Sequence, residues 1–99
     1  MTKEDTLAIL NEAFPSLQAK YGLREISVFG SVARNEAALG SDVDLLVEFE
    51  PGKACGFFAF YALQKELEKL LGAPVDLVSL DALKPQLKNR ILAEAIRAA

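Results

Sequence analysis

Hydrophobic and polar positions along the chain follow two spacings, one typical of helices and one typical of strands. Apolar residues at helical spacing predict four helices, over residues 2–20, 31–39, 57–71 and 86–97. Runs of β-forming residues predict three strands, over residues 24–29, 41–50 and 75–80. Because helices and strands alternate, we expect an α/β or α+β domain with one small sheet flanked by helices.

The ends of the first predicted helix are marked by local signals. Thr2 or Asp5 is a suitable N-cap, and Gly22 is a suitable stop. Pro15 interrupts the helical spacing, so we expect a kink or a break there.

The strand predicted over residues 41–50 has two distinct faces. One face is wholly apolar and consists of Val43, Leu45, Val47 and Phe49. The other face is mostly acidic and consists of Asp42, Asp44, Leu46, Glu48 and Glu50. A turn at residues 51–52 ends the strand, since a Pro-Gly pair is typical of turns.

Helix 57–71 is amphipathic and ends at Gly72. Its spacing predicts an inward face made of Phe60, Leu63, Leu67 and Leu70. Phe57 and Phe58 cannot both face inward, so the aromatic group of Phe57, Phe58, Phe60 and Tyr61 is a candidate contact surface. For Phe60, a place in the core is the favoured interpretation. Residues 81–83 predict a short helical turn, and the last helix carries a stripe of Leu87, Ile91 and Ala95.

Gly30 and Ser31 lie between a predicted strand and helix 31–39, which Ser31 would cap and Gly40 would end. The first turn of such a helix has free backbone N–H groups and a partial positive charge. Gly30 allows a ligand to approach the backbone, and Ser31 adds a hydroxyl. The pair is therefore a candidate phosphate site, although taken alone it is more often a simple turn and cap.

Asp42 and Asp44 are two residues apart on a predicted strand, so their carboxylates point the same way. Carboxylate oxygens suit Mg²⁺, which completes its coordination with substrate phosphates. The alternative is a solvated strand face or a turn cap.

Asp76 lies within an apolar strand, where a lone carboxylate is costly unless another group compensates it. If that strand neighbours the one with Asp42 and Asp44, the three residues form one cluster. An edge-strand Asp76 facing water is the alternative.

Composition narrows the chemistry. The 99 residues fit one domain over 1–99, with 52% hydrophobic residues and a net charge of −3. This mild acidity predicts no direct nucleic-acid binding, and no apolar run is long enough for a membrane span. Histidine is absent, and Cys55, the single cysteine, is expected to have no catalytic role. We expect a cytoplasmic protein.

The combined motifs resemble those of the minimal nucleotidyltransferases of the DNA polymerase β superfamily. The resemblance covers most of the chain from residue 24 onward and rests on segments 28–34, 41–47, 74–78 and 83–94, together with Glu36. Asn35 and residues 37–39 depart from the usual loop of that family.

The resemblance implies a polymerase-β-like fold and a division of roles among the candidate residues. Gly30 and Ser31 would hold the phosphates of ATP, and Asp42 and Asp44 would bind Mg²⁺. Asp76 would share a second metal and assist deprotonation of the attacking hydroxyl. Arg34 would reach a phosphate or pair with Glu36 or an Asp, and we favour the pairing.

The resemblance also implies a partner. Minimal proteins of this family are often antitoxins that transfer AMP from ATP to a tyrosine of a helical HEPN-type toxin. Two other functions stay open: a non-catalytic antitoxin that acts by binding, and a transferase for a small hydroxylated molecule. The presence of all three aspartates favours the enzyme.

Overall fold

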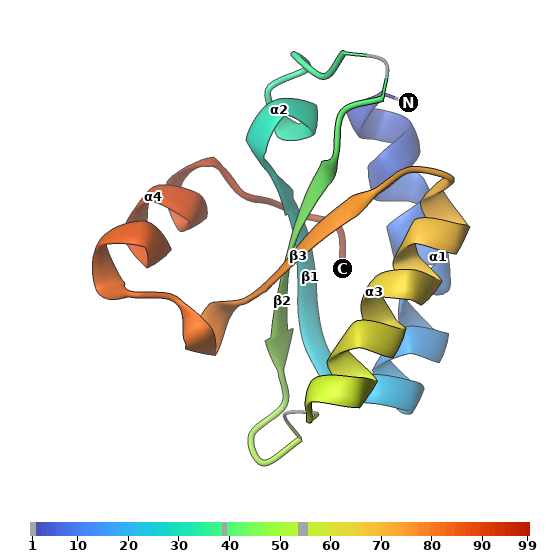
Figure 1. The fold of residues 1–99 in the computed structure, drawn as a ribbon, viewed down its shortest axis with the longest axis vertical. Coiled ribbons are helices and arrows are strands. Elements are labelled where there is room, and N and C mark those ends of the chain that lie inside the picture. The colour runs from blue at the N-terminus through green and yellow to red at the C-terminus, as the bar shows by residue number, and fades with distance from the viewer. Residues whose placement is uncertain (1, 39, 54–55) are drawn as a thin grey trace.

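The computed structural model describes residues 2–38, 40–53 and 56–99 (Figure 1). The elements follow in the order α1 (Lys3–Tyr21), β1 (Leu23–Phe29), α2 (Gly30–Ala33), β2 (Val43–Phe49), α3 (Phe57–Leu71), β3 (Val75–Ser79), the 3-10 turn η1 (Leu80–Ala82), α4 (Pro85–Glu94) and β4 (Ile96–Arg97). Cys55 and Leu39, on which the sequence made predictions, lie outside the described residues.

The four strands form one mixed sheet in the order β3-β2-β1-β4. Strand β1 is antiparallel to both β2 and β4, whereas β2 and β3 are parallel. A parallel pair needs a long crossover, and α3 supplies it. The predicted small mixed sheet flanked by helices is therefore confirmed.

The helices lie on both faces of this sheet. In Figure 1, α1 and α3 lie together on one side of the sheet and α4 lies on the other. The side facing α1 and α3 contains the core, including the predicted apolar face of β2 (Val43, Leu45, Val47 and Phe49), all of it buried. The acidic face of β2 is thereby left on the α4 side.

Helix α1 begins and ends where the sequence predicts, but it does not break at Pro15. The Thr2 hydroxyl accepts the Asp5 N–H at 3.0 Å, and Gly22 ends the helix with a left-handed φ of 74°. The helix is continuous through Pro15 because Leu10 and Leu17, on either side, are both buried against the sheet. Tertiary packing thus outweighs the local cost of proline.

Helix α3 has the predicted bounds, but its buried stripe is shifted. Leu63, Leu67 and Leu71 are buried, at spacings of four residues, while Leu70 is 40% exposed. The prediction that Leu70 faces inward is therefore wrong. Phe60 packs on the core as expected, and both Phe57 and Phe58 are exposed.

The helix predicted over 31–39 is much shorter, since α2 ends at Ala33. Asn35 has a left-handed φ of 59°, and described residues 34–38 are exposed, so no apolar contact sustains a longer helix. Phe29, not Ser31, is at the N-cap position, and Gly40 does not end the helix. The prediction of Ser31 as an N-cap is wrong.

The last predicted helix, over 86–97, ends at Glu94. Ile96 and Arg97 form β4 instead, and they pair with Val28 and Ser27 of β1. This pairing provides hydrogen-bond partners for backbone groups at the edge of β1. Such a long-range contact cannot be detected from the local spacing of apolar residues.

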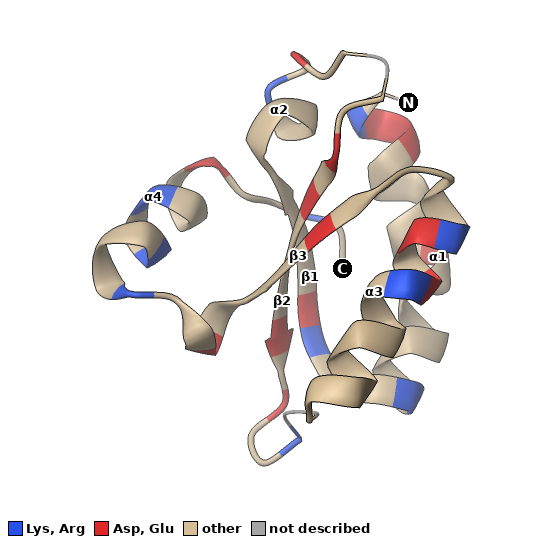
Figure 2. Cartoon of the chain, in the orientation of Figure 1, with Lys and Arg blue, Asp and Glu red and all other residues tan. Residues whose placement is uncertain are grey.

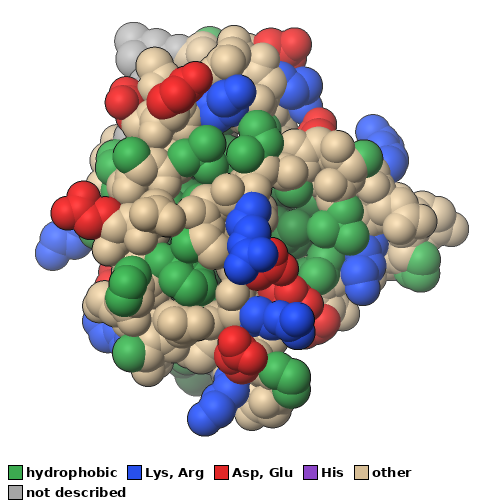
Figure 3. All heavy atoms as spheres, turned by 180° about the vertical axis from the view of Figure 1, so that it is seen from behind, with side chains coloured by type: hydrophobic (Ala, Val, Ile, Leu, Met, Phe, Trp, Pro, Cys, Tyr) green, Lys and Arg blue, Asp and Glu red, His purple; other side chains and the backbone are tan. Residues whose placement is uncertain are grey.

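Some of the surface charges form ion pairs with near neighbours. The Lys20–Glu66 and Glu25–Arg97 ion pairs are both 3.1 Å long. Figure 3 shows acidic and basic side chains next to each other on the face behind the view of Figure 1. Within the described residues, no helix is both long enough and apolar enough to cross a bilayer.

Candidate active site

Two neighbouring parallel strands bring two of the predicted aspartates together. Asp44 of β2 is in direct register with Asp76 of β3, so both side chains leave the same face of the sheet. Figure 2 shows the acidic segments of the two strands side by side where they cross. Asp42 precedes the first residue of β2 and is exposed, as is Asp76, while Asp44 is half-buried.

The pKa of Asp44 is shifted by its surroundings in this acidic group. Partial burial, followed by the negative charges of Asp76 and then Asp42, raises the pKa of the Asp44 carboxyl above its ordinary value. Each of these causes disfavours the ionised form. A cation between the carboxylates would remove the repulsion, and the arrangement therefore favours binding of a positive ion.

Gly30 packs directly against Asp44. It has a left-handed φ of 71°, and a Cβ atom placed on it would overlap with Oδ2 of Asp44. The register also places Phe29, the residue before Gly30, opposite Asp44. Glycine is thus required at this position both for its backbone conformation and for the close approach of the carboxylate.

Ser31 is half-buried in the first turn of α2, next to Gly30. The structure thus brings the candidate phosphate residues to the end of β1, beside the Asp44 end of β2. The first N–H groups of a helix have no partner within the helix, so those at the start of α2 are available to other acceptors.

Glu94 is the residue of this region that sequence reasoning missed. Its Oε1 accepts the Gly30 N–H at 2.9 Å, and its Oε2 accepts a guanidinium N–H of Arg34 at 2.9 Å. Arg34 also donates to Glu36 at 2.9 Å, as predicted. Glu94 is 64 residues from Gly30 in the sequence, so no local spacing signals the contact.

The donor set suits Mg²⁺ in part. Within residues 2–38, 40–53 and 56–99, no three or more acidic, cysteine or histidine side chains are grouped closely enough to hold a metal ion by themselves. Two carboxylates are sufficient for Mg²⁺ when substrate phosphates complete its coordination. Asp44, whose pKa is raised by burial and by neighbouring carboxylates, fits that use.

Known proteins are similar to this chain in sequence and in fold. The model of the nucleotidyltransferase domain family matches residues 10–98. The protein adenylyltransferase MntA of Thermococcus cleftensis is 41% identical over 96 residues, which cover 97% of this chain and 95% of that protein.

Solved structures agree with the sequence matches. One, provisionally assigned as a minimal nucleotidyltransferase, is 47% identical with a TM-score of 0.78, and the match covers 97% of this chain and 95% of that one. Another belongs to a complex of a tri-AMPylated Shewanella oneidensis HEPN toxin with MNT antitoxin. It has a TM-score of 0.70 at 21% identity, covers 95% of this chain and 71% of that one, and shows likeness of fold alone.

Proposed function

This chain belongs to the nucleotidyltransferase domain family, as its motifs predict, and from that membership we propose that it transfers AMP from ATP to a hydroxyl group of a partner protein. The relative from Thermococcus cleftensis is named for protein adenylylation, and it matches nearly the whole chain. The proposal extends that activity to this protein.

One observation supports the proposal most strongly: Asp44 lies in register with Asp76 and in contact with Gly30. Nucleotidyl transfer needs a seat for a triphosphate beside carboxylates that manage charge at the α-phosphorus. Here the candidate phosphate seat at Gly30 is in direct contact with the side chain of Asp44.

Each residue has a defined role in the proposed reaction. Gly30 and Ser31 hold phosphate oxygens through backbone N–H groups and the hydroxyl. The acceptor oxygen attacks the α-phosphorus, the bond from that phosphorus to the bridging oxygen of the β-phosphate breaks, and pyrophosphate leaves. Asp76, which is exposed and therefore accessible to an acceptor, takes the hydroxyl proton.

Asp42 and Asp44 would hold Mg²⁺, and Asp76 would share a second ion. When bound, the metal offsets phosphate charge and orients the triphosphate for in-line attack. The contact between Asp44 and Gly30 holds the carboxylate in a fixed position relative to the phosphate seat.

The proposed acceptor is a tyrosine of a HEPN-type toxin, which the AMP group would silence. The solved complex of an AMPylated HEPN toxin with MNT antitoxin supports this partner by analogy of fold. A tyrosine hydroxyl, with a pKa of about 10, is mostly protonated at neutral pH and needs a nearby base. Because the reaction consumes ATP, we place the protein in the cytoplasm.

Label transfer from α-labelled ATP to the product of the neighbouring gene tests this function. We expect transfer with the wild type and with Asp81→Asn, and at least a hundredfold less with Asp76→Asn, since a general base contributes about 10²–10⁴-fold. Asp81 is a matched control because it is an exposed aspartate in η1, outside the site. Equal transfer by Asp76→Asn would contradict the role of Asp76. Silencing of the partner without any label transfer would favour an antitoxin that acts only by binding.

A further inference from the structure

Helix α4 is tied to the candidate phosphate seat through the carboxylate of Glu94. Both of its oxygens are used: Oε1 accepts the Gly30 N–H, and Oε2 accepts the Arg34 guanidinium, each at 2.9 Å. Glu94 is the last residue of α4, so this side chain joins the end of the helix to the start of α2.

The groups that Glu94 contacts are those an incoming polyphosphate would use. Carboxylate and phosphate oxygens accept hydrogen bonds from backbone N–H groups and guanidinium in the same way. In the structure the Gly30 N–H donates to Glu94, and Arg34 is shared between Glu94 and Glu36. A phosphate that binds the Gly30 N–H must therefore replace the Glu94 carboxylate.

Charge leads to the same conclusion. Glu94 places its negative charge at the Gly30 N–H, and Gly30 is itself in contact with Asp44. Glu94 is thus close enough to act on the acidic group. A triphosphate in this region adds negative charge, and a nearby carboxylate then opposes its binding.

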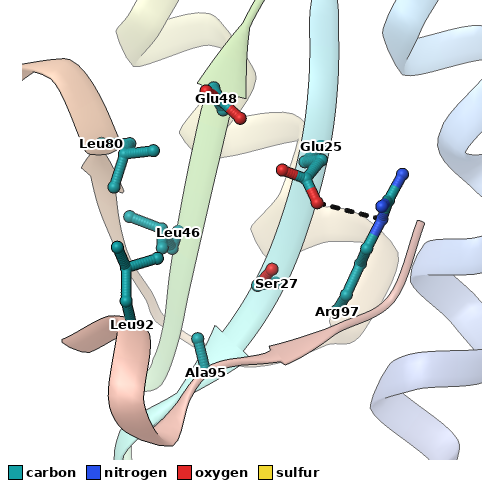
Figure 4. Close-up of a pocket in the computed structure, with 8 residues that line it drawn as sticks. All are labelled: Glu25, Ser27, Leu46, Glu48, Leu80, Leu92, Ala95 and Arg97. Atoms are coloured by element: carbon teal, nitrogen blue, oxygen red, sulfur yellow. Dashed lines mark ion pairs between the residues drawn. The ribbon is translucent and has the colours of Figure 1, made fainter. Parts of the chain in front are cut away.

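Helix α4 is loosely attached, which makes its displacement inexpensive. No residue of α4 is buried, and Leu87 and Leu92 are 47% and 46% exposed. A hollow of about 190 Å³ lies between the helix and the sheet, where Leu92 of α4 lies next to Leu46 of β2 (Figure 4). Segments with few buried apolar contacts are the ones that open locally at low free-energy cost.

We infer that Glu94 is a latch, an internal anion that occupies the phosphate seat and holds α4 closed until ATP replaces it. The inference rests on the proposed function, because it assigns Gly30 to the phosphates of ATP. Nucleotide binding and release of α4 then occur together, because a phosphate of ATP replaces the Glu94 carboxylate at Gly30. Glu94 is therefore a regulatory residue, because the Gly30 N–H becomes available to a phosphate only when the Glu94 carboxylate is displaced.

Binding of Mg²⁺-ATP without partner, measured by titration calorimetry, tests the latch. We expect Glu94→Gln to bind about three- to tenfold more tightly than the wild type, because a charge-assisted contact is replaced by a weaker neutral one. Glu36→Gln is the matched control, since Glu36 pairs with Arg34, whereas the Gly30 N–H donates to Glu94. Its affinity should stay within about twofold of the wild type, because exposed ion pairs contribute little.

The outcomes separate the latch from the proposed function. If the wild type binds ATP and Glu94→Gln binds equally or less tightly, Glu94 merely positions the loop and the latch is wrong. If the wild type does not bind ATP at all, the proposed function fails, and the latch fails with it.

Hydrogen exchange supplies a second test, on the wild type and on both variants. ATP should speed amide exchange across residues 85–94 of the wild type, because the helix is released, while exchange in β2 stays slow. In the nucleotide-free state, Glu94→Gln should already exchange faster over the same residues, and Glu36→Gln should not. Slower or unchanged exchange of α4 on adding ATP would overturn the latch.

Discussion

At the scale of single residues, the metal-binding role proposed for Asp44 conflicts with the stability of the free protein. Its ionised carboxylate is partly buried between Asp76 and Asp42, which is unfavourable without a cation. Residues in active sites are often arranged in this way, because the group that strains the free protein is the one the ligand satisfies.

Replacing Asp44 by Asn should stabilise the free protein at pH 7 by about 0.5–1 kcal/mol, as expected for removal of a like charge between neighbouring strands. The pKa of Asp44 in the folded state is raised above its ordinary value of 3.8. Its destabilising effect is therefore absent below about pH 3.8 and grows as the pH rises through the folded-state pKa. Thermal melting should show the gain for Asp44→Asn at pH 7 and its loss at pH 3. A variant less stable than the wild type at pH 7 would contradict this account.

Mg²⁺ and ATP should reverse the order of stability. Under the proposed function, Mg²⁺-ATP binds the folded protein alone, so it should raise the melting temperature of the wild type but not that of Asp44→Asn. A variant that keeps the wild-type shift would disprove the assignment of Asp44 to the metal.

Gly30 and Gly52 allow the cost of backbone conformation to be separated from the cost of the contact with Asp44. Both have a left-handed φ, of 71° and 75°, but only Gly30 has a neighbour where a Cβ would lie. Gly52→Ala should cost about 1–2 kcal/mol from conformation alone. Gly30→Ala should cost more, because it must also displace Asp44, and it should lose nucleotide transfer. Equal stability losses with full transfer in both would show that the contact with Asp44 is unimportant.

Ser31→Ala should have a mild effect. One neutral hydrogen bond contributes about 0.5–1.5 kcal/mol, so we expect roughly two- to tenfold weaker ATP binding while the backbone N–H groups remain. Calorimetry measures it directly, and complete loss of activity would indicate a further role for Ser31.

At the scale of elements, the sequence predicted what is locally encoded and missed what depends on distant contacts. Strands β1, β2 and β3 and the bounds of α3 were predictable from local apolar patterns, although the pattern placed Leu70 on the wrong face of α3. The conversion of residues 96–97 to a strand was not, since it depends on the free edge of β1. The shortness of α2 follows from Asn35, whose left-handed backbone has only a weak signature in the sequence.

Helix α3 allows a test of the corrected packing. Leu67 is fully buried, and Leu70 is 40% exposed, although the helical spacing suggested that both face the core. Leu67→Ala should cost about 2–5 kcal/mol, as do other large-to-small changes in a core, and Leu70→Ala should cost less than about 1 kcal/mol. Urea denaturation measures both, and similar losses would show that the assigned face of α3 is wrong.

At the scale of the whole molecule, the sheet separates stability from chemistry. One face packs against α1 and α3 and contains the core, while the opposite face carries Asp44, Asp76 and the latch of α4. The proximity of Asp44, Asp76 and Gly30 could be predicted from the sequence, because their spacing fits neighbouring strands and a turn. Glu94 was not identifiable, since only the complete fold brings α4 to α2.

The most direct test of the central claim is the intact mass of the proposed toxin partner after incubation with this protein, ATP and Mg²⁺. The account predicts a gain of one or more AMP units, located on tyrosine by fragmentation and absent when Asp44→Asn replaces the wild type. An unchanged mass for a partner that is nevertheless bound and silenced would contradict the account.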